Sequence, residues 1–107
     1  MNDRELMVVQ TTFKDQDKAE TIAALLVDAG LAVCAQVESA VVSFYRYEGQ
    51  MKKEIEVPVA FKVLPLRLDL FLGELMLQHP YEIPQILGWP TTYVDKKYLA
   101  WAKGKTL

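Results

Sequence analysis

The sequence predicts an α+β fold in which an antiparallel sheet is covered on one face by two helices. Two observations support this class. The hydrophobic period alternates between two and 3.6 residues along the chain, in the order strand, helix, strand, strand, helix, strand and a final helix. A glycine-containing turn also joins two long runs of period two. We expect a single domain over residues 1–107, since 51% hydrophobic residues suffice for one core.

The first strand and helix are predicted at the N-terminal end of the chain. Residues 6–12 form a short apolar and β-branched run that is typical of a buried strand. Apolar residues at helical spacing then predict a helix over residues 15–29, and Asp17 followed by Glu20 resembles a capping box at its start. Gly30 can adopt the left-handed conformation that ends such a helix.

Two alternating runs and a turn predict a long hairpin in the middle of the chain. The period is two over residues 31–47, apart from a break near residue 39, and residues 48–50 (Glu-Gly-Gln) carry the turn signal. The returning run, residues 54–63, alternates most regularly. Pro58 lies within it and cannot donate to a ladder, so we expect it at an edge or a bulge. Because both runs are long for a small domain, the hairpin is expected to project and to pair with a neighbouring copy.

A second helix is predicted over residues 66–78, with an apolar stripe on each of two opposite sides. The stripes are formed by Leu68, Phe71, Leu72 and Leu75 on one side and by Leu66, Leu70, Gly73 and Leu77 on the other. Covering a sheet requires one stripe, so the second indicates packing against another element or subunit, and Gly73 would permit a close approach. The alternative is an apolar surface without a partner. A short strand at residues 86–90 and a helix capped by Asp95 follow.

This order of elements folds most naturally as a ferredoxin-like βαββαβ sandwich with a long central hairpin and a C-terminal helix. Two helices cover only one face of the sheet. The other face carries Val, Tyr and Ala at many positions, so we expect it to be buried between subunits.

Charge and composition argue against several classes of partner. The net charge of −2 provides no general attraction for nucleic acid or an anionic membrane. The lone Cys34 excludes an intrachain disulfide framework, which is consistent with a reducing compartment. No apolar run approaches the ~20 residues of a membrane span, and the first residues do not resemble a signal peptide. We therefore expect a soluble, cytoplasmic protein.

Residues 79–84 (His-Pro-Tyr-Glu-Ile-Pro) are the strongest functional candidate. They hold the only histidine, and the two prolines impose a stiff, non-helical turn after the second helix. Cys34, His79 and Glu82 are the available metal-ligand types: a thiolate and an imidazole suit copper, and a carboxylate suits a harder divalent ion. No CxxC, HxxxH or carboxylate cluster accompanies them. The alternatives are a buried cysteine, a hydrogen-bonded histidine that ends the helix, and a glutamate with a backbone or lysine partner.

A cleft between subunits is the second candidate site. We expect Ser43, Tyr45, Lys62 and Tyr81 to line it beside His79, where an anion could bind. The alternative for Lys62 is a solvated edge or an ion pair with a nearby glutamate. The alternative for the tyrosines is packing at an interface while their hydroxyls find polar partners.

Short motifs along nearly the whole chain resemble the CutA divalent-cation-tolerance family. They are Gly30-Leu31-Ala32 with Cys34, Ser43 with Tyr45-Arg46-Tyr47-Glu48-Gly49, Glu56-Val57, Lys62, His79-Pro80-Tyr81-Glu82 with Pro84, Pro90, and Tyr98-Leu99 with Trp101. The resemblance implies a fold similar to PII signalling proteins and a tight homotrimer held by long strands. It also implies binding of copper or other divalent cations, with no obligatory cofactor. Departures include Gln36, where the family has Asn, and Tyr47, where it has Trp.

The function expected from these observations is a trimeric divalent-cation (copper-type) binding protein in metal tolerance or response, without catalysis. The alternative is a PII-like small-effector sensing module with its ligand at the subunit clefts. An enzyme such as an acylphosphatase needs a phosphate-cradling loop after the first strand, and residues 11–15 contain no glycine. An RNA-binding sandwich would need an aromatic and basic strand motif that this sequence lacks.

Overall fold

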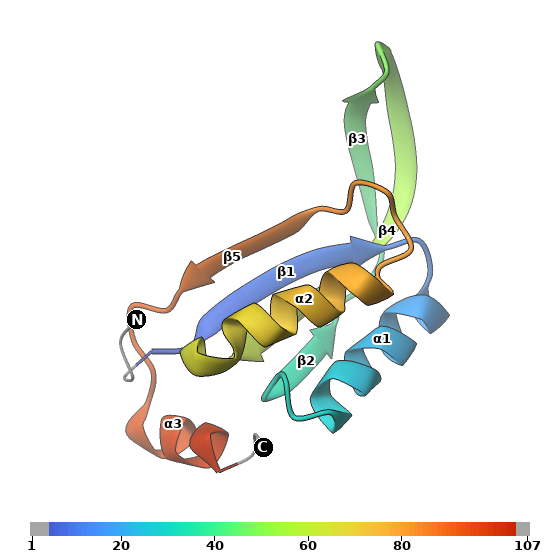
Figure 1. Ribbon diagram of the computed structural model, residues 1–107. Coiled ribbons are helices and arrows are strands. Elements are labelled where there is room, and N and C mark those ends of the chain that lie inside the picture. The colour runs from blue at the N-terminus through green and yellow to red at the C-terminus, as the bar shows by residue number, and fades with distance from the viewer. Residues whose placement is uncertain (1–4, 105–107) are drawn as a thin grey trace.

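The computed structural model describes residues 5–104, and within them the predicted order of elements holds with one correction (Figure 1). The alternating run at residues 31–47 forms two separate strands, because the strand breaks at residues 38–40. A 3-10 turn at Pro65–Arg67 leads into the second helix. The elements are β1 (Met7–Phe13), α1 (Gln16–Asp28), β2 (Cys34–Val37), β3 (Val41–Tyr47), β4 (Gln50–Val63), α2 (Leu68–Gln78), β5 (Ile86–Pro90) and α3 (Lys96–Lys103).

The sheet is antiparallel throughout, with the strand order β2-β4-β1-β5. The long strand β4 pairs with β2 over its second half and with β3 over its first half. The β3–β4 hairpin consequently projects beyond the rest of the sheet, as predicted (Figure 1). Its turn places Glu48 and Gly49 at φ of 51° and 78°, as a type I′ turn requires. Pairing of the hairpin with a second copy stays a prediction.

Pro58 lies in a central strand, opposite a bulge, which is one of the two positions expected for it: residues 38–40 stand opposite residues 57 and 58 of β4. Pro58 faces Thr12 of β1, and its carbonyl accepts a hydrogen bond of 2.9 Å from the backbone N–H of Glu38. A strand residue directs its nitrogen and its carbonyl to the same side. The nitrogen of Pro58 therefore faces the break between β2 and β3, where no ladder hydrogen bond is lost.

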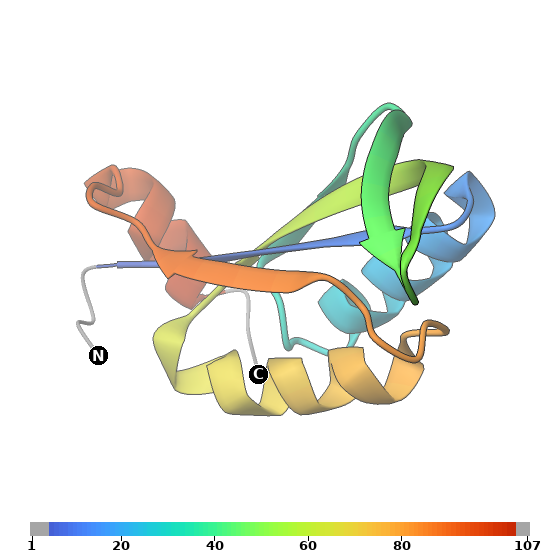
Figure 2. The same ribbon diagram turned by 90° about the horizontal axis from the view of Figure 1, so that it is seen from above.

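The core lies between the sheet and the helices α1 and α2, which cover the same face (Figures 1 and 2). Phe61 of β4 and Phe71 of α2 meet edge to face at its centre, with their ring centroids 4.9 Å apart. The predicted inner stripe of α2 is confirmed, since Phe71 and Leu75 are fully buried and Leu68 and Leu72 pack against the core. The alternation of β4 puts Ile55 on the same side as the buried residues Val57 and Val59. Ile55 is nevertheless exposed, because it lies on the hairpin, beyond the part of the sheet that the helices cover.

The helix ends follow local capping, with one correction. Asp15, not Asp17, caps α1: its carboxylate accepts a hydrogen bond of 2.8 Å from the backbone N–H of Lys18. Gly30 then adopts the left-handed conformation with φ of 74°, as expected. Asp95 caps α3 as predicted, by accepting hydrogen bonds from the two backbone N–H groups of Lys97 and Tyr98.

In the part of the chain that the structure describes, two apolar surfaces stand out as exposed. The first is the sheet face opposite the helices together with the hairpin, and it includes Leu87, Trp89, Phe44 and Met51. The second is the outer stripe of α2 with the 3-10 turn before it, where Leu66 of the turn is 97% exposed and Leu77 of the helix is 76% exposed. Within residues 5–104 nothing lies within 4 Å of the position of a Cβ at Gly73, so the close approach expected there is not made within the chain.

Candidate functional site

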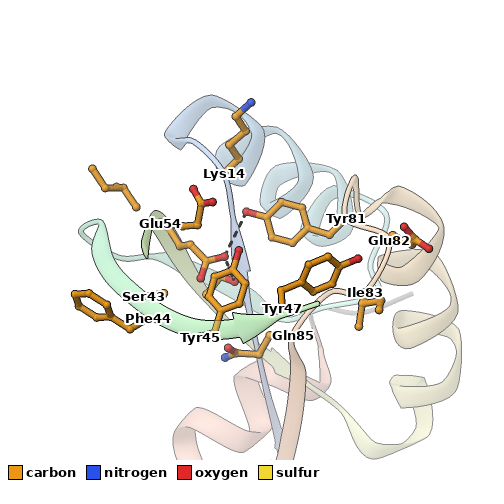
Figure 3. A pocket seen from close by; sticks show the side chains of 13 residues that line it. Lys14, Ser43, Phe44, Tyr45, Tyr47, Glu54, Tyr81, Glu82, Ile83 and Gln85 are labelled. Carbon is orange, nitrogen blue, oxygen red and sulfur yellow. Dashed lines mark hydrogen bonds between the residues drawn. The ribbon is translucent and has the colours of Figure 1, made fainter. Parts of the chain in front are cut away.

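A groove of about 720 Å³ lies where the β3–β4 hairpin meets the end of β1 and the loop at residues 79–85 (Figure 3). β3 contributes Ser43, Tyr45 and Tyr47, which occupy every second position and therefore share one side of that strand. β4 contributes Glu54 and Glu56 to the groove. The loop contributes Tyr81 and Glu82, among other residues. The hairpin, the end of β1 and the loop are distant in the sequence, and they meet at this groove.

His79 supports the groove from beneath instead of facing it. Its side chain is 7% exposed and stacks on Phe13, with ring centroids 4.5 Å apart. The backbone N–H of Tyr81 donates to Nδ1 at 3.2 Å, so Nδ1 carries no proton. Nε2 then carries the proton and donates it to the carbonyl of Thr12 at 3.0 Å, with the hydroxyl of Thr11 at 3.1 Å. The histidine that ends α2 is therefore a neutral, hydrogen-bonded anchor for the loop.

The stability of the protein is expected to depend on the charge of His79. Burial lowers the pKa of His79 below its ordinary value of 6.5, against smaller opposing effects of the Thr12 carbonyl and of Glu56. The unfolded chain therefore takes up a proton more readily than the folded chain. The stability is complete above about pH 6.5 and is lost as the pH falls through the lowered pKa. Urea unfolding at neutral and acidic pH will measure this loss, and it should be smaller in His79→Phe, which cannot titrate. Equal pH dependence in both proteins would contradict the assignment.

Glu56 is the acceptor at the centre of the groove. Its Oε2 accepts hydrogen bonds from the hydroxyl of Thr12 at 3.0 Å and from that of Tyr81 at 3.3 Å. Burial and the negative charge of Glu56 raise the pKa of Tyr81 to about 12. Burial, Glu54 and Glu56 likewise raise the pKa of Tyr45. Both phenols therefore remain protonated near neutral pH, and burial is the largest cause of each pKa shift, with the nearby carboxylates adding to it.

Within one chain the charge of the groove is opposite to the one that would favour an anion, and anion binding in a cleft between subunits stays a prediction. Three carboxylates line it, those of Glu54, Glu56 and Glu82, against the single ammonium group of Lys14. Figure 3 shows the Lys14 amine at the rim and directed away from the tyrosine rings. A groove with this balance attracts cations and repels anions.

The structure brings some of the predicted site residues together and separates others. Ser43, Tyr45, Tyr81 and Glu82 line the groove. Lys62 is not among its lining residues, since its ammonium group donates to the side chain of Gln36. Cys34 lies opposite Lys62 on the neighbouring strand, with its Sγ 3.5 Å from the hydroxyl of Tyr98.

The expected metal-ligand set does not converge in one chain. Across residues 5–104, no three His, Cys, Asp or Glu side chains form a group that could hold a metal ion. Cys34, His79 and Glu82 therefore do not make a single site within a protomer. Metal binding that uses more than one chain stays a prediction.

Sequence reasoning missed Glu54, Glu56 and Lys14 as lining residues. A signal for the glutamates was present in the hairpin. A two-residue turn at Glu48-Gly49 sets Ser43 opposite Glu54. The register also sets Glu56 opposite Val41, so it places both glutamates on the same side of β4 as the groove.

The fold and the groove together define a small α+β sandwich protein with a projecting hairpin and an acidic, tyrosine-lined groove at its base. The family model for the CutA1 divalent ion tolerance protein matches residues 7–105. The chain belongs to this family. No helix within residues 5–104 is long and apolar enough to cross a membrane.

Relatives and solved structures agree with this assignment. The chain is 34% identical over 97 residues to the divalent-cation tolerance protein CutA of Citrobacter koseri, covering 91% of this chain and 84% of that protein. Among solved structures, CutA1 of the psychrotrophic bacterium Shewanella sp. SIB1 has a TM-score of 0.90 at 31% identity, with 96% of this chain and 95% of that chain covered. CutA of Synechococcus elongatus has a TM-score of 0.91 at 29% identity, with coverage of 95% and 90%.

Proposed function

We propose that this protein is a homotrimer that binds divalent, copper-type cations and acts in tolerance of, or response to, metal ions without catalysing a reaction. The observation that carries this proposal is the negative groove, in which Glu54, Glu56 and Glu82 outnumber Lys14. The names of the curated relatives support it, since they describe divalent-cation tolerance. The exposed apolar sheet face supports assembly, because a surface of this kind favours burial between subunits.

The chemistry of the side chains fits divalent cations in two different places. Carboxylate oxygens at Glu54, Glu56 and Glu82 suit hard ions, whereas the Cys34 thiolate suits a softer one such as copper. In the proposed trimer, a neighbouring chain would supply the additional ligands that a single chain does not assemble. His79 would have to give up hydrogen bonds at both ring nitrogens in order to bind a metal, so its proposed part is to hold the loop that carries Glu82.

A second candidate function is a PII-like effector module that takes a small molecule into the groove. Three tyrosines line it, which is more aromatic surface than a metal ion requires. Its volume of about 720 Å³ also lies within the range of small-molecule sites.

Solution mass and a cation titration in reducing buffer test the first proposal. We expect a trimer that binds copper or zinc, with affinity about ten-fold weaker in a Glu54→Gln/Glu56→Gln variant. Glu20→Gln is the matched control, because Glu20 lies on α1 and contacts Gln16 instead of the groove. Binding that is absent, or equal in all three proteins, would contradict a cation site in the groove.

A further inference from the structure

We infer that the groove binds an organic dication of the diamine or polyamine class. This inference rests on the second of the two proposed functions, a small ligand bound in the groove. The ligand class follows from three features of the groove: its tyrosine rings, the separation of its carboxylates and its size.

Three tyrosine rings form the middle of the groove. Tyr45 and Tyr47 project from the same face of β3, and Tyr81 faces them from the loop after α2 (Figure 3). An alkylammonium group is attracted to the face of an aromatic ring by the ring quadrupole, and its methylene chain gains apolar contact with the same rings. A hydrated metal ion gains much less from such a surface, because it prefers oxygen ligands.

The carboxylates lie at two separate places around these rings. Glu54 and Glu56 lie on one face of β4. Figure 3 shows Glu82 on the far side of the rings from Glu54, at the rim of the groove, with its exposed carboxylate directed away from the rings. Glu56 uses one oxygen for Thr12 and Tyr81, which leaves the other to accept a hydrogen bond from a ligand. Within residues 5–104, the carboxylate of Glu54 has no hydrogen-bond or ion-pair partner. Each place can therefore accept from one ammonium group, which has three donors.

The same separation disfavours a single bare ion in one chain. Calcium and magnesium are surrounded by about six or more oxygens at ~2.0–2.6 Å, and that requires converging ligands. No such group of three acidic, histidine or cysteine side chains exists in residues 5–104. Two spaced ammonium groups joined by a flexible chain match two spaced acidic places, and a groove of about 720 Å³ accommodates a ligand of this size.

Calorimetric titration of the full chain with 1,4-diaminobutane and spermidine at ~0.15 M ionic strength tests this inference. The comparison ligands are butylamine, which has one charge, and 1,4-butanediol, which has none. We expect the diamine to bind about ten-fold more tightly than butylamine, and the diol not to bind. Tyr45→Ala and Glu54→Gln should each weaken the diamine about ten-fold. Tyr93→Ala, at an exposed tyrosine outside the groove, is the matched control and should bind as the wild type does.

The outcomes separate this inference from the proposed function. Diamine binding no tighter than that of butylamine, or unchanged in Tyr45→Ala, overturns the inference. A zinc titration run in parallel then decides whether the proposed cation-binding function also fails. If zinc binds, if this binding depends on Glu54 and if the diamine does not bind, the cation-binding function stands and the assignment of an organic ligand is wrong. If neither binds to the folded protein, both are wrong.

Discussion

Replacing Leu87 by glutamate is expected to convert the proposed trimer into monomers. Leu87 is 52% exposed on the sheet face opposite the helices, where Trp89 lies beside it on the same strand. An exposed side chain tolerates a charge in the monomer, but a carboxylate buried in an apolar interface loses its hydration at a cost of several kcal/mol. A trimer would bury three of them. Light scattering over a range of protein concentrations measures the mass, and circular dichroism checks that the variant remains folded.

The matched control is Leu77→Glu on the outer stripe of α2. Leu77 is 76% exposed on the opposite side of the molecule, so the same substitution there should leave the trimer intact. The pair therefore decides which of the two apolar surfaces is the subunit interface. If Leu77→Glu dissociates the assembly and Leu87→Glu does not, the interface lies on α2, and the sheet face is exposed apolar surface.

Replacing His79 by alanine is expected to lower the free energy of unfolding by about 2–4 kcal/mol. The change leaves the Thr12 carbonyl and the Tyr81 N–H without the partners that the imidazole provides, and both lie near the buried end of β1. It also removes the stacked contact with Phe13. Because His79 anchors the loop, Tyr81 should lose its hydrogen bond to Glu56 as well, and ligand binding in the groove should weaken. Urea unfolding at one fixed protein concentration measures the stability.

Two further variants separate the contributions to this effect. His79→Phe retains an aromatic ring for Phe13 but cannot hydrogen-bond, so it should retain part of the lost stability. Gln78→Ala removes only an exposed contact to Glu74 on the same helix and should cost less than about 0.5 kcal/mol. A loss in His79→Ala no larger than that in Gln78→Ala would show that the buried hydrogen bonds contribute nothing measurable.

Local patterns predicted most of the fold because each element has its own periodic signal. The inner stripe of α2, the turn at Glu48-Gly49 and the stop at Gly30 all follow from a few neighbouring residues, and all three are confirmed. The exceptions involve choices between neighbours or between strands. Asp15 and Asp17 carry the same side chain two residues apart, so composition could not decide which of them caps α1. For Pro58 the sequence left an edge and a bulge open, and only the pairing of the strands decided for the bulge.

The candidate site was predicted less completely, because it depends on which strands lie side by side. Ser43, Tyr45 and Tyr81 meet as expected, but Lys62 lies elsewhere and Glu54 and Glu56 take its place as charged groups. That exchange reverses the sign of the charge that the groove attracts. The role of His79 changed for the same reason: its ring is hydrogen-bonded to β1 through Nε2 and to the loop through Nδ1, and these two segments are distant from each other in sequence.

By itself the sequence determined the elements, their order and the face of each that is apolar, because periodicity and capping act over a few residues. It also held the family resemblance that the match over residues 7–105 bears out. Only the tertiary structure decided that the groove is acidic, that His79 is a buried anchor and that Cys34 stands apart from both. Those properties depend on burial and on electrostatic contact across 25 or more positions of the chain, such as that between Tyr81 and Glu56. Contacts of this kind exist only once the sheet and its loops have come together.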